Sequence, residues 1–440
     1  MVNNTVKEVL AFVEENDVQF IRLAFCDVLG MQKNISIMPE ELLSAFENGV
    51  SFDAYAISGF RDVTRSDLLL FPDPATLMVL PWRPGPGRVV RFYCDIRNPD
   101  GSLFSHDSRY LLKQVINRCE EMGYTCKIGA ECEFYLFKTD ENGEPSDTTL
   151  DNGGYLDIAP LDKGENIRRE ICLYLKEMGI RPEASHHEQG PGQNEIDFKF
   201  GDALACADNL LTLKAAVKAI ASRNGLFASF MPKPIPAAPG SGMHVNLSLH
   251  RDGFNIFKTK AGEHSVVAES FIAGILERAQ EMTLFLNPLT NSYERLGKFE
   301  APKFVSWSHQ NRSQLVRIPT ATGEKARMEL RSPDPSLNPY LGFALIIAAG
   351  LEGVGKNSPL PPAEDVDLFA ANSSDTKNLA PLPDTLEAAI ELAENSSFVR
   401  SVIGEELLGK IIAIKKEEAA AANRAEDREK FYQEQYFAVI

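Results

Sequence analysis

The sequence predicts an α+β protein with two domains, a small N-terminal α+β domain and a larger second domain. Segments in which apolar and polar side chains alternate, as in strands, are mixed with segments of helical periodicity. Strands and helices do not follow one another in the regular alternation that a doubly wound sheet requires. With 440 residues, the chain is long enough to build two separate cores.

Residues 1–103 are predicted to form the first domain. In chain order, the patterns indicate a helix over 5–15, strands over 18–26 and 32–38, a helix over 39–49, irregular backbone over 51–65, a Pro-rich stretch over 71–88 and a strand over 89–96. The next segment, RNPDGSLFSHDSR, is rich in turn residues. We therefore expect the domain boundary there, after residue 103.

Residues 104–440 are predicted to form the second domain. Its helices are expected over residues 108–123, 165–179, 209–225 and 267–286, with an amphipathic helix rich in Lys and Glu from Ser397 onward. Its strands are expected over residues 127–138, 194–200, 244–249, 313–319 and 327–333. The sequence contains no internal repeat.

The composition is that of a globular protein, and it limits the class of partner. The formal net charge of −17 disfavours nucleic acid or an anionic membrane as the main partner. The seven cysteines form no CxxC pair and are predicted to be reduced thiols. The N-terminal apolar run contains acids, unlike a signal peptide, and no run of about 18 uncharged apolar residues occurs. We therefore expect a cytoplasmic protein without a membrane span.

The segment KIGAECEFYLFK, residues 127–138, places two carboxylates two residues apart on a predicted strand. Alternation puts the apolar side chains on one face, where we expect a core, and Glu131 and Glu133 on the other face, roughly 6–7 Å apart. Two like charges side by side on a buried sheet are costly unless cations offset them. A solvent-facing edge explains one such pair equally well.

Three further strands carry a polar face opposite an apolar one. Their polar side chains are His244, Asn246 and Ser248; Arg327, Glu329 and Arg331; and Glu195, Asp197 and Lys199. Glu188 precedes Glu195 across a Gly/Pro turn. A half-solvated sheet can show the same alternation. These faces, however, mainly carry residues that can bind metals, together with arginines, instead of the usual Lys, Thr and Gln.

The acids and the histidine of these faces form an oxygen-rich set suited to Mg²⁺ or Mn²⁺. Glu131 and Glu133 are too far apart to chelate one ion easily, so two neighbouring ions are predicted. Five arginines supply planar donors for phosphate and carboxylate groups: Arg295, Arg312, Arg317, Arg327 and Arg331. Divalent metal ions and arginines are the groups that typically stabilise phosphoryl transfer from a nucleotide. The chain has no GxxxxGK[ST] and no kinase Gly-rich loop, so an ATP site must be built another way.

Several long motifs, in order along nearly the whole chain, resemble the glutamine synthetase family of type I. They are FDAYAISGF, GAECEFYLF, EASHHEQGPGQNEIDFKF, FMPKP with GSGMHVNLSL, NSYERL with EAP, NRSQLVRIP and RMELRSPDPSLNPY. The resemblance implies a β-grasp-like first domain and a catalytic second domain with a funnel-like antiparallel barrel flanked by helices. It also implies a homo-oligomer, usually a dodecamer of two stacked hexameric rings, in which a neighbour's first domain completes each active site.

The resemblance also implies roles for single residues. One metal ion would be held by Glu133, Glu188 and Glu195, and the other by Glu131, His244 and Glu329. Substrate glutamate would be held by Arg295, Arg331 and Gly240, with His244 beside them. The ATP phosphates would be held by Arg312, Arg317 and Arg327, and the nucleoside by Glu183, Phe200 and Ser248. The catalytic residues would be Arg312, Asp53 from a neighbouring subunit and Glu300 on a mobile flap.

The function that this resemblance implies is an ATP-dependent ligase that forms L-glutamine from L-glutamate and ammonia. ATP would convert the γ-carboxylate to γ-glutamyl phosphate, while metal ions and arginines offset the charge on the transferring group. Asp53 would draw a proton from ammonium, leaving NH₃ as the nucleophile. Glu300 would close over the site and keep water from the intermediate.

Three departures from the usual family motifs lie beside the predicted acceptor pocket. FDAYAI stands where the family usually has FDGSSI, Pro239 replaces an asparagine, and the spacing from Arg295 to Glu300 is one residue shorter. Two alternatives therefore stay open. One is a γ-glutamyl-amine ligase that uses an organic amine. The other is an inactive structural relative, which would be identified by the loss of metal ligands. For His186 and His187, packing or hydrogen bonding is favoured over a role in the site.

Overall fold

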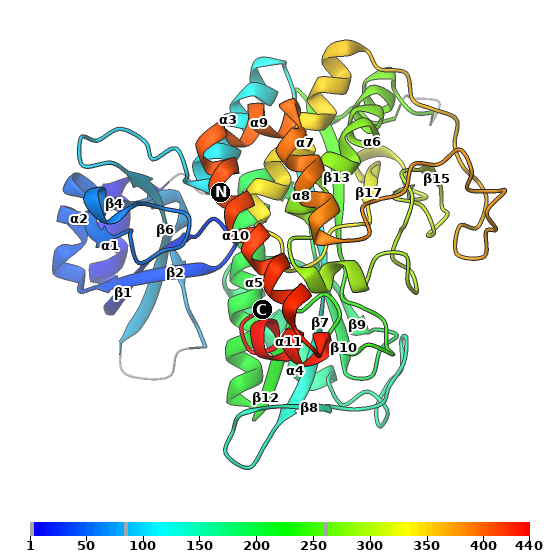
Figure 1. The fold of residues 1–440 in the computed structure, drawn as a ribbon. Helices are drawn as coiled ribbons and strands as arrows, with labels where there is room; N and C mark the ends of the chain where they lie inside the picture. Colours follow the sequence, from blue (N-terminus) through cyan, green and yellow to red (C-terminus); the bar gives the residue numbers. More distant parts are fainter. Residues whose placement is uncertain (1–3, 83–86, 259–262) are drawn as a thin grey trace.

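The structure is a computed structural model that describes residues 4–82, 87–258 and 263–440 (Figure 1). Two sheets organise it, a six-stranded sheet within residues 18–97 and an 11-stranded sheet within residues 125–330. Strands and helices are mixed in both parts, so the predicted α+β class is confirmed. Residues 83–86 of the predicted Pro-rich stretch lie outside the described residues.

The small sheet has the order β2-β1-β6-β4-β3, with β5 paired to β6. Its strands are β1 (Val18–Cys26), β2 (Gln32–Ile37), β3 (Val50–Asp53), β4 (Asp67–Pro72), β5 (Met78–Val79) and β6 (Arg88–Arg97). The helices α1 (Val6–Glu15) and α2 (Leu42–Asn48) accompany it. The predicted helix over 5–15 and strand over 18–26 are confirmed. The sequence patterns did not predict β3 and β4, since a four-residue strand and a run of leucines show no clear alternation.

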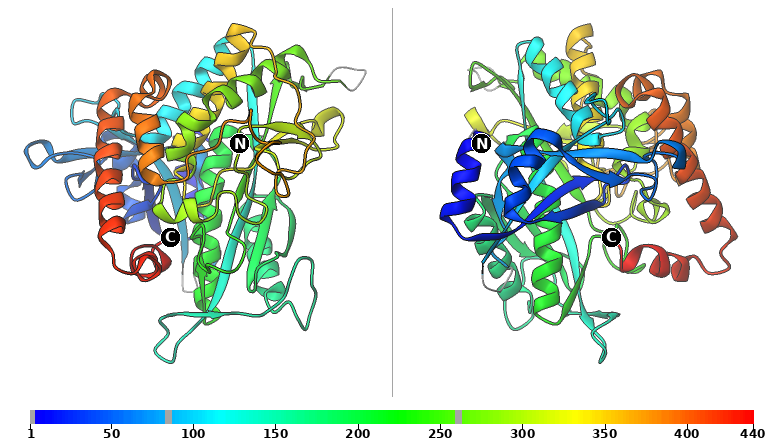
Figure 2. Two further views of the ribbon diagram at one scale, coloured as in Figure 1. Left: turned by 45° about the vertical axis from the view of Figure 1, so that its right-hand side comes forward. Right: turned by 90° about the vertical axis from the view of Figure 1, so that its left-hand side faces the viewer.

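The large sheet curls into a half-barrel whose main path is β15-β16-β17-β13-β7-β10-β9. The strands on this path are β7 (Thr125–Thr139), β9 (Pro182–His187), β10 (Gln193–Phe198), β13 (Met243–Arg251), β15 (Trp307–His309), β16 (Val316–Ile318) and β17 (Met328–Leu330). Short strands pair at its margins: β8 (Pro145–Thr149), β11 (Gly201–Asp202), β12 (Leu226–Ser229) and β14 (Phe254–Asn255). All neighbours on the path are antiparallel except β15 and β16. The β7–β8 hairpin projects from one end of the molecule (Figures 1 and 2).

β7 pairs with five other strands of the half-barrel, and its two faces differ as predicted. The apolar side chains Ile128, Ala130, Cys132, Phe134 and Leu136 are at most 1% exposed. On the other face, cross-strand pairing sets the acids beside further polar residues. The pairs are Glu133 with Glu195, Glu131 with His244, and Asn246 with Glu329. Directly paired residues share a face of the sheet, so these side chains form one polar surface.

Helices cover the sheet and fill the rest of the second domain (Figure 2). They are α3 (Ser108–Glu121), α4 (Glu165–Glu177), α5 (Ala203–Arg223), α6 (Val266–Leu286), α7 (Pro339–Lys356), α8 (Leu386–Asn395), α9 (Ser397–Ile403), α10 (Glu405–Arg424) and α11 (Arg428–Tyr432). α3 and α5 pack against β7, and α7 packs against α3, α5 and α6. The predicted single helix from Ser397 is instead divided into three. Within the described ranges, no helix is long and apolar enough to cross a bilayer.

A buried cation on α3 joins the two sheets. Arg109 forms ion pairs of 2.9 Å with Asp73 and 3.0 Å with Asp95, both from the small domain, and of 3.0 Å with Asp208 on α5. A buried ion pair is stable only when its geometry is well defined. The network therefore fixes the small sheet against the half-barrel. The domain boundary after residue 103, in the connection between β6 and α3, stays a prediction.

Candidate active site

Two cavities meet on the polar face of β7. The larger has a volume of about 1510 Å³ and the smaller about 320 Å³, and Glu131 and Asp197 line both. The predicted site residues that line the larger cavity are Glu183, Phe200, Ser248 and Arg327. Those that line the smaller cavity are Glu133, Glu188, Glu195, Gly240, His244, Arg295, Glu300, Arg312, Arg317 and Arg331. The strand patterns and the family resemblance thus name residues that the fold gathers from distant segments.

Glu131, His244 and Glu329 form the first group of candidate metal ligands. His244 Nδ1 lies 3.3 Å from Glu131 Oε2 and 3.6 Å from Glu329 Oε1. One ligand atom from each residue lies within 4.8 Å of the others. Burial and the nearby Arg331 lower the pKa of His244, which favours the neutral imidazole that binds metals. Two carboxylates and one neutral imidazole at this spacing fit a divalent cation.

A second group contains Glu188, Glu195 and His186, whose ligand atoms also lie within 4.8 Å of one another. His186 lies 3.5 Å from Glu188 Oε1 and 3.4 Å from Glu195 Oε1. Packing or hydrogen bonding, the role favoured for His186 from the sequence, stays a prediction, and its position between these two acids was not predicted. The available signal was its position two residues before Glu188, on the strand that pairs with Glu195. The role of Glu133 in this group stays a prediction.

Glu133 lies beside this group, where neutral donors hold its carboxylate. Glu133 Oε2 accepts hydrogen bonds from Gln193 Nε2 at 2.8 Å and from the Gly242 amide at 2.9 Å. Gln193 also donates to the Gly240 carbonyl at 3.1 Å. The predicted metal ligand Glu133 and the predicted glutamate-binding backbone at Gly240 therefore share one amide side chain.

A third cluster, buried Asp151, Asp162 and His187, has a structural explanation. His187 Nε2 lies 2.9 Å from Asp151 Oδ1, as the predicted hydrogen-bonding role requires. Asp151 also accepts hydrogen bonds from the backbone amides of Gly153, Lys163 and Gly192. Asp162 pairs with Arg168 at 2.6 Å. Because these carboxylates are satisfied by the protein, the cluster fixes the loop that follows β8.

Negative charge is concentrated where the two cavities meet. Burial and the neighbouring Glu188 raise the pKa of Glu133 to about 8. Burial and the carboxylates of Glu195 and Glu131 raise the pKa of Asp197 to about 10. Asp197 stands on the same strand face as Glu195 but was given no role in the sequence analysis. A bound cation stabilises the ionised form of such crowded carboxylates, so this position is suited to a metal centre.

Of the arginines that line the smaller cavity, Arg295 and Arg331 are buried and Arg317 is half-buried. Arg331 Nη1 donates a 2.6 Å hydrogen bond to Glu329, and Arg317 Nε donates one of 2.5 Å to the same carboxylate. Arg295 donates to the Ser332 carbonyl at 2.8 Å. Among the described residues, the buried Nε of Arg331 has no hydrogen-bond partner. A buried donor without a partner is costly, so Arg331 can bind an anionic ligand at little further cost.

Residues 296–301, which we call the flap, carry Glu300 over the smaller cavity. Gln189 Nε2 donates a 2.6 Å hydrogen bond to Glu300 Oε1, and Arg331 Nη2 lies 3.8 Å from Glu300 Oε2. Phe299, the preceding residue, has a φ of 52°, in the left-handed region. The flap is therefore positioned by contacts with both the acidic side and the arginine side of the cavity.

Glu329 lines neither cavity but belongs to the first group of candidate ligands, whereas Asp53 belongs to neither cavity and to neither ligand group. Asp53 ends β3 in the small sheet, is exposed, and accepts a 3.0 Å hydrogen bond from the Tyr55 amide. Asp53 lines neither cavity of its own chain. Its predicted function in a neighbouring subunit stays a prediction.

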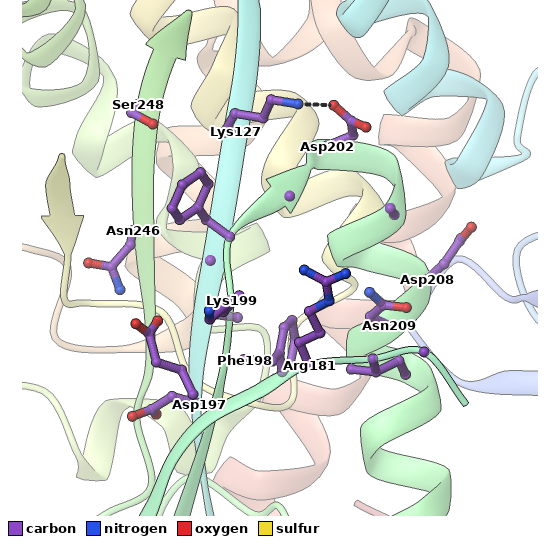
Figure 3. A pocket seen from close by; sticks show the side chains of 18 of the residues that line it. Lys127, Arg181, Asp197, Phe198, Lys199, Asp202, Asp208, Asn209, Asn246 and Ser248 are labelled. Atoms are coloured by element: carbon purple, nitrogen blue, oxygen red, sulfur yellow. Dashed lines mark hydrogen bonds and ion pairs between the residues drawn. The ribbon is translucent and has the colours of Figure 1, made fainter. Parts of the chain in front are cut away.

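The larger cavity offers groups for an aromatic and phosphorylated ligand (Figure 3). Figure 3 shows Ser248 and Asn246 on one strand and the ion pair between Lys127 and Asp202. The nitrogen and oxygen atoms of this pair lie 2.5 Å apart. Phe200 is 43% exposed, and its ring lies 6.3 Å from that of His250. Arg327 Nε donates a 2.8 Å hydrogen bond to Asn246. An accessible ring can stack on the base of a nucleotide, and a guanidinium can bind its phosphates.

Comparisons with known proteins agree with this geometry. The family described as "Glutamine synthetase, beta-Grasp domain" matches residues 17–99, and "Glutamine synthetase, catalytic domain" matches residues 105–433. Glutamine synthetase of Clostridium saccharobutylicum is 46% identical over 419 residues, which are 94% of each chain. Glutamine synthetase of Methanosarcina mazei is 46% identical over 424 residues, again 94% of each chain.

Solved structures share the fold. A GmaS/ADP complex, 29% identical, superposes with a TM-score of 0.87 and covers 97% of this chain and 98% of its own. Plasmodium falciparum glutamine synthetase, 24% identical, has a TM-score of 0.86 over 99% of both chains and supports the fold alone. The β-grasp and half-barrel architecture is thus confirmed. The two family matches and the 46% identical relatives show that the chain belongs to the glutamine synthetase family.

Proposed function

We propose that the chain is a glutamine synthetase, an ATP-dependent ligase that forms L-glutamine from L-glutamate and ammonia through γ-glutamyl phosphate. The observation that carries the proposal is the junction of two cavities at Glu131 and Asp197. The larger cavity suits a nucleotide, and the smaller one, lined with acids and arginines, suits glutamate. A phosphoryl group that passes from one ligand to the other crosses this junction.

We assign two divalent cations, Mg²⁺ or Mn²⁺, to the junction. Glu131, His244 and Glu329 would hold one, and Glu133, Glu188 and Glu195 would hold the other, with His186 as a further candidate ligand. When bound, the cations supply positive charge that stabilises a transferring phosphoryl group. The raised pKa values of Glu133 and Asp197 support this assignment. They show that the neighbouring carboxylates repel one another when no cation is bound between them.

The arginines and the flap complete the proposed mechanism. Glutamate would be held beside His244 by Arg295, Arg331 and the backbone at Gly240. The ATP phosphates would be held by Arg312, Arg317 and Arg327. The nucleoside would be held by Glu183, Phe200 and Ser248. Arg331 is suited to a substrate carboxylate because its Nε is buried with no hydrogen-bond partner among the described residues. Glu300 would exclude water from γ-glutamyl phosphate.

Ammonium would be handled by Asp53 of a neighbouring subunit, which draws off a proton and leaves NH₃ as the nucleophile. The proposal thus includes a homo-oligomer, a dodecamer of two hexameric rings, in the cytoplasm. It is supported by the position of Asp53, which lines neither cavity of its own chain.

The test is an acceptor assay. Purified protein with ATP, Mg²⁺ and glutamate is offered ammonium and a panel of organic amines, while phosphate release and the amide product are both measured. We expect glutamine, with the highest kcat/KM for ammonium, as the names of the 46% identical relatives suggest. An amide formed only from organic amines would refute ammonia as the acceptor. No phosphate release with any acceptor would indicate an inactive relative.

A further inference from the structure

Lys233 lies between β12 and β13 and has no role in the mechanism above. Its side chain is 3% exposed, Nζ donates a hydrogen bond to the Ala238 carbonyl, and Nζ lies 4.3 Å from the centroid of the Phe299 ring. Asn291 fixes its backbone through hydrogen bonds of 2.7 Å from Lys233 N and 3.0 Å to Lys233 O. Burial and repulsion from Lys298 lower the pKa of Lys233 to about 8, so the cation predominates at neutral pH.

Phe299 needs a partner to keep its conformation. Its φ of 52° is unfavourable for a bulky side chain, and its ring is 47% exposed, so burial contributes only part of the compensation. A cation over the ring face supplies an attraction that depends on the position of the ring. Glu300 follows Phe299 directly, so the ring contact also fixes where the Glu300 backbone lies.

The same cation is tied to the backbone proposed to bind glutamate. Ala238, which accepts the Lys233 hydrogen bond, precedes Gly240 by two residues. This loop is held at three further points: Pro239 O accepts from Tyr135 Oη at 2.6 Å, Gly240 O accepts from Gln193, and Ser241 N donates to Pro232 O at 2.8 Å. Lys233 therefore contacts an anchored loop on one side and the flap on the other.

We propose that Lys233 is a positioning residue that holds the flap closed through Phe299. The inference rests on the proposed function, in which Glu300 shields γ-glutamyl phosphate. When the flap opens, water cleaves the acyl phosphate, which returns glutamate and releases phosphate. ATP is then consumed without amide formation. Lys233 touches no reacting atom. It changes the ratio of acyl phosphate hydrolysis to amide formation.

The test measures phosphate released per glutamine formed at saturating ammonium. Lys233→Met removes the charge and keeps an unbranched stem, and Phe299→Leu removes the ring. Each should raise the ratio about fivefold, the population change that one partly exposed cation–π contact supports. The double variant should match either single one, because both remove the same contact. Lys233→Arg and Phe299→Tyr, which keep a cation and a ring, should restore a ratio near that of the parent.

A second readout is independent of the reaction. Lys298 is an exposed trypsin site within the flap, and Lys377 is an exposed site in the segment between α7 and α8. Without substrates, Lys233→Met and Phe299→Leu should speed cleavage after Lys298 about fivefold and leave cleavage after Lys377 unchanged. If the parent makes no glutamine, the proposed function fails, while cleavage still tests the flap contact.

Three outcomes would overturn the inference. One is a Phe299→Leu protein with the parent's product ratio and cleavage rate. Another is a double variant whose effects multiply. The third is a Lys233→Met protein with a lower kcat at an unchanged ratio, which would mark a merely structural lysine. If Lys233→Met does not fold, Phe299→Leu, altered at a half-exposed position, decides the question.

Discussion

The guanidinium of Arg331 donates a 2.6 Å hydrogen bond to the carboxylate of Glu329, and both side chains are 1% exposed. Arg317 approaches the same carboxylate from the neighbouring strand. Glu329 thus joins two arginines to the first group of candidate metal ligands. Removing the carboxylate would take away a ligand and leave two cations without their partner.

We predict that Glu329→Ala abolishes turnover, with phosphate release at least about a hundredfold below that of the parent with any amine. The variant should still assemble, because the surrounding strands keep their pairing. Glu329→Gln, which preserves the volume and one acceptor oxygen, is the matched control for packing and should also be inactive. Phosphate release near the parent's value from either protein would remove Glu329 from the metal site.

We predict that Glu300→Ala uncouples ATP use from amide formation. The carboxylate that accepts the Gln189 hydrogen bond is lost, so water reaches γ-glutamyl phosphate and phosphate release exceeds glutamine formation. Glu300→Gln keeps an acceptor for Gln189 and should hold the product ratio near that of the parent. Equal losses of both products in Glu300→Ala would instead indicate a role in substrate binding.

We predict that mixing restores activity to two inactive proteins. Asp53→Ala and Glu329→Ala oligomers should each be nearly inactive. When they are unfolded together and co-assembled in equal amounts, random pairing around a head-to-tail ring gives roughly a quarter of the sites both an intact Asp53 and an intact Glu329. Activity should fall again when the mixture is skewed. A flat curve from properly assembled mixed oligomers would mean that Asp53 serves its own chain.

We predict that Asp107 makes the folded protein less stable as the pH rises from 4 to 7. Burial raises the pKa of this carboxyl from 3.8 to about 6, so the folded state binds its proton more tightly than the unfolded state does. The stabilisation is therefore complete below about pH 4 and is lost as the pH rises through 6, at a cost of about 3 kcal/mol.

Asp107→Asn isolates this effect, since the amide stays neutral and can still cap α3. The difference in unfolding midpoint, variant minus parent, should increase by about 2 °C between pH 4.5 and pH 7.5. Other buried acids titrate in both proteins and cancel in the difference. A difference that is constant with pH would show that Asp107 titrates near its ordinary value.

The polar face of β7 was predictable because the strand has a period of two and its apolar face is buried. Glu131, Glu133, His244 and Glu329 followed from that pattern together with the family motifs. α7 was not predicted, since PYLGFALIIAAGLEGVGK is apolar on nearly every side and has no amphipathic period. Its burial against α3, α5, α6 and α9 explains that composition.

Contacts between loops were beyond sequence patterns. Lys233 and Phe299 are separated by α6 and neighbouring segments, and no periodicity links them. Asp197 and His186 lie on the predicted polar surface, but which of its side chains approach one another depends on how far the sheet curls. Alternation fixes the face of a side chain, whereas curvature sets its distance from residues on other strands.

Some residues of the candidate site lie on strands and others lie on or next to loops, and this difference affects how such a protein can diversify. Inserting one residue in β7 would turn Cys132 to the polar face in place of the acids, because side chains alternate. The loop that follows Asp53 and the loops that carry Gly240 and Glu300 have no such constraint and tolerate changes of length. Gene duplicates can therefore acquire a different nucleophile by insertions and deletions in three loops, while selection preserves the sheet that activates the carboxylate.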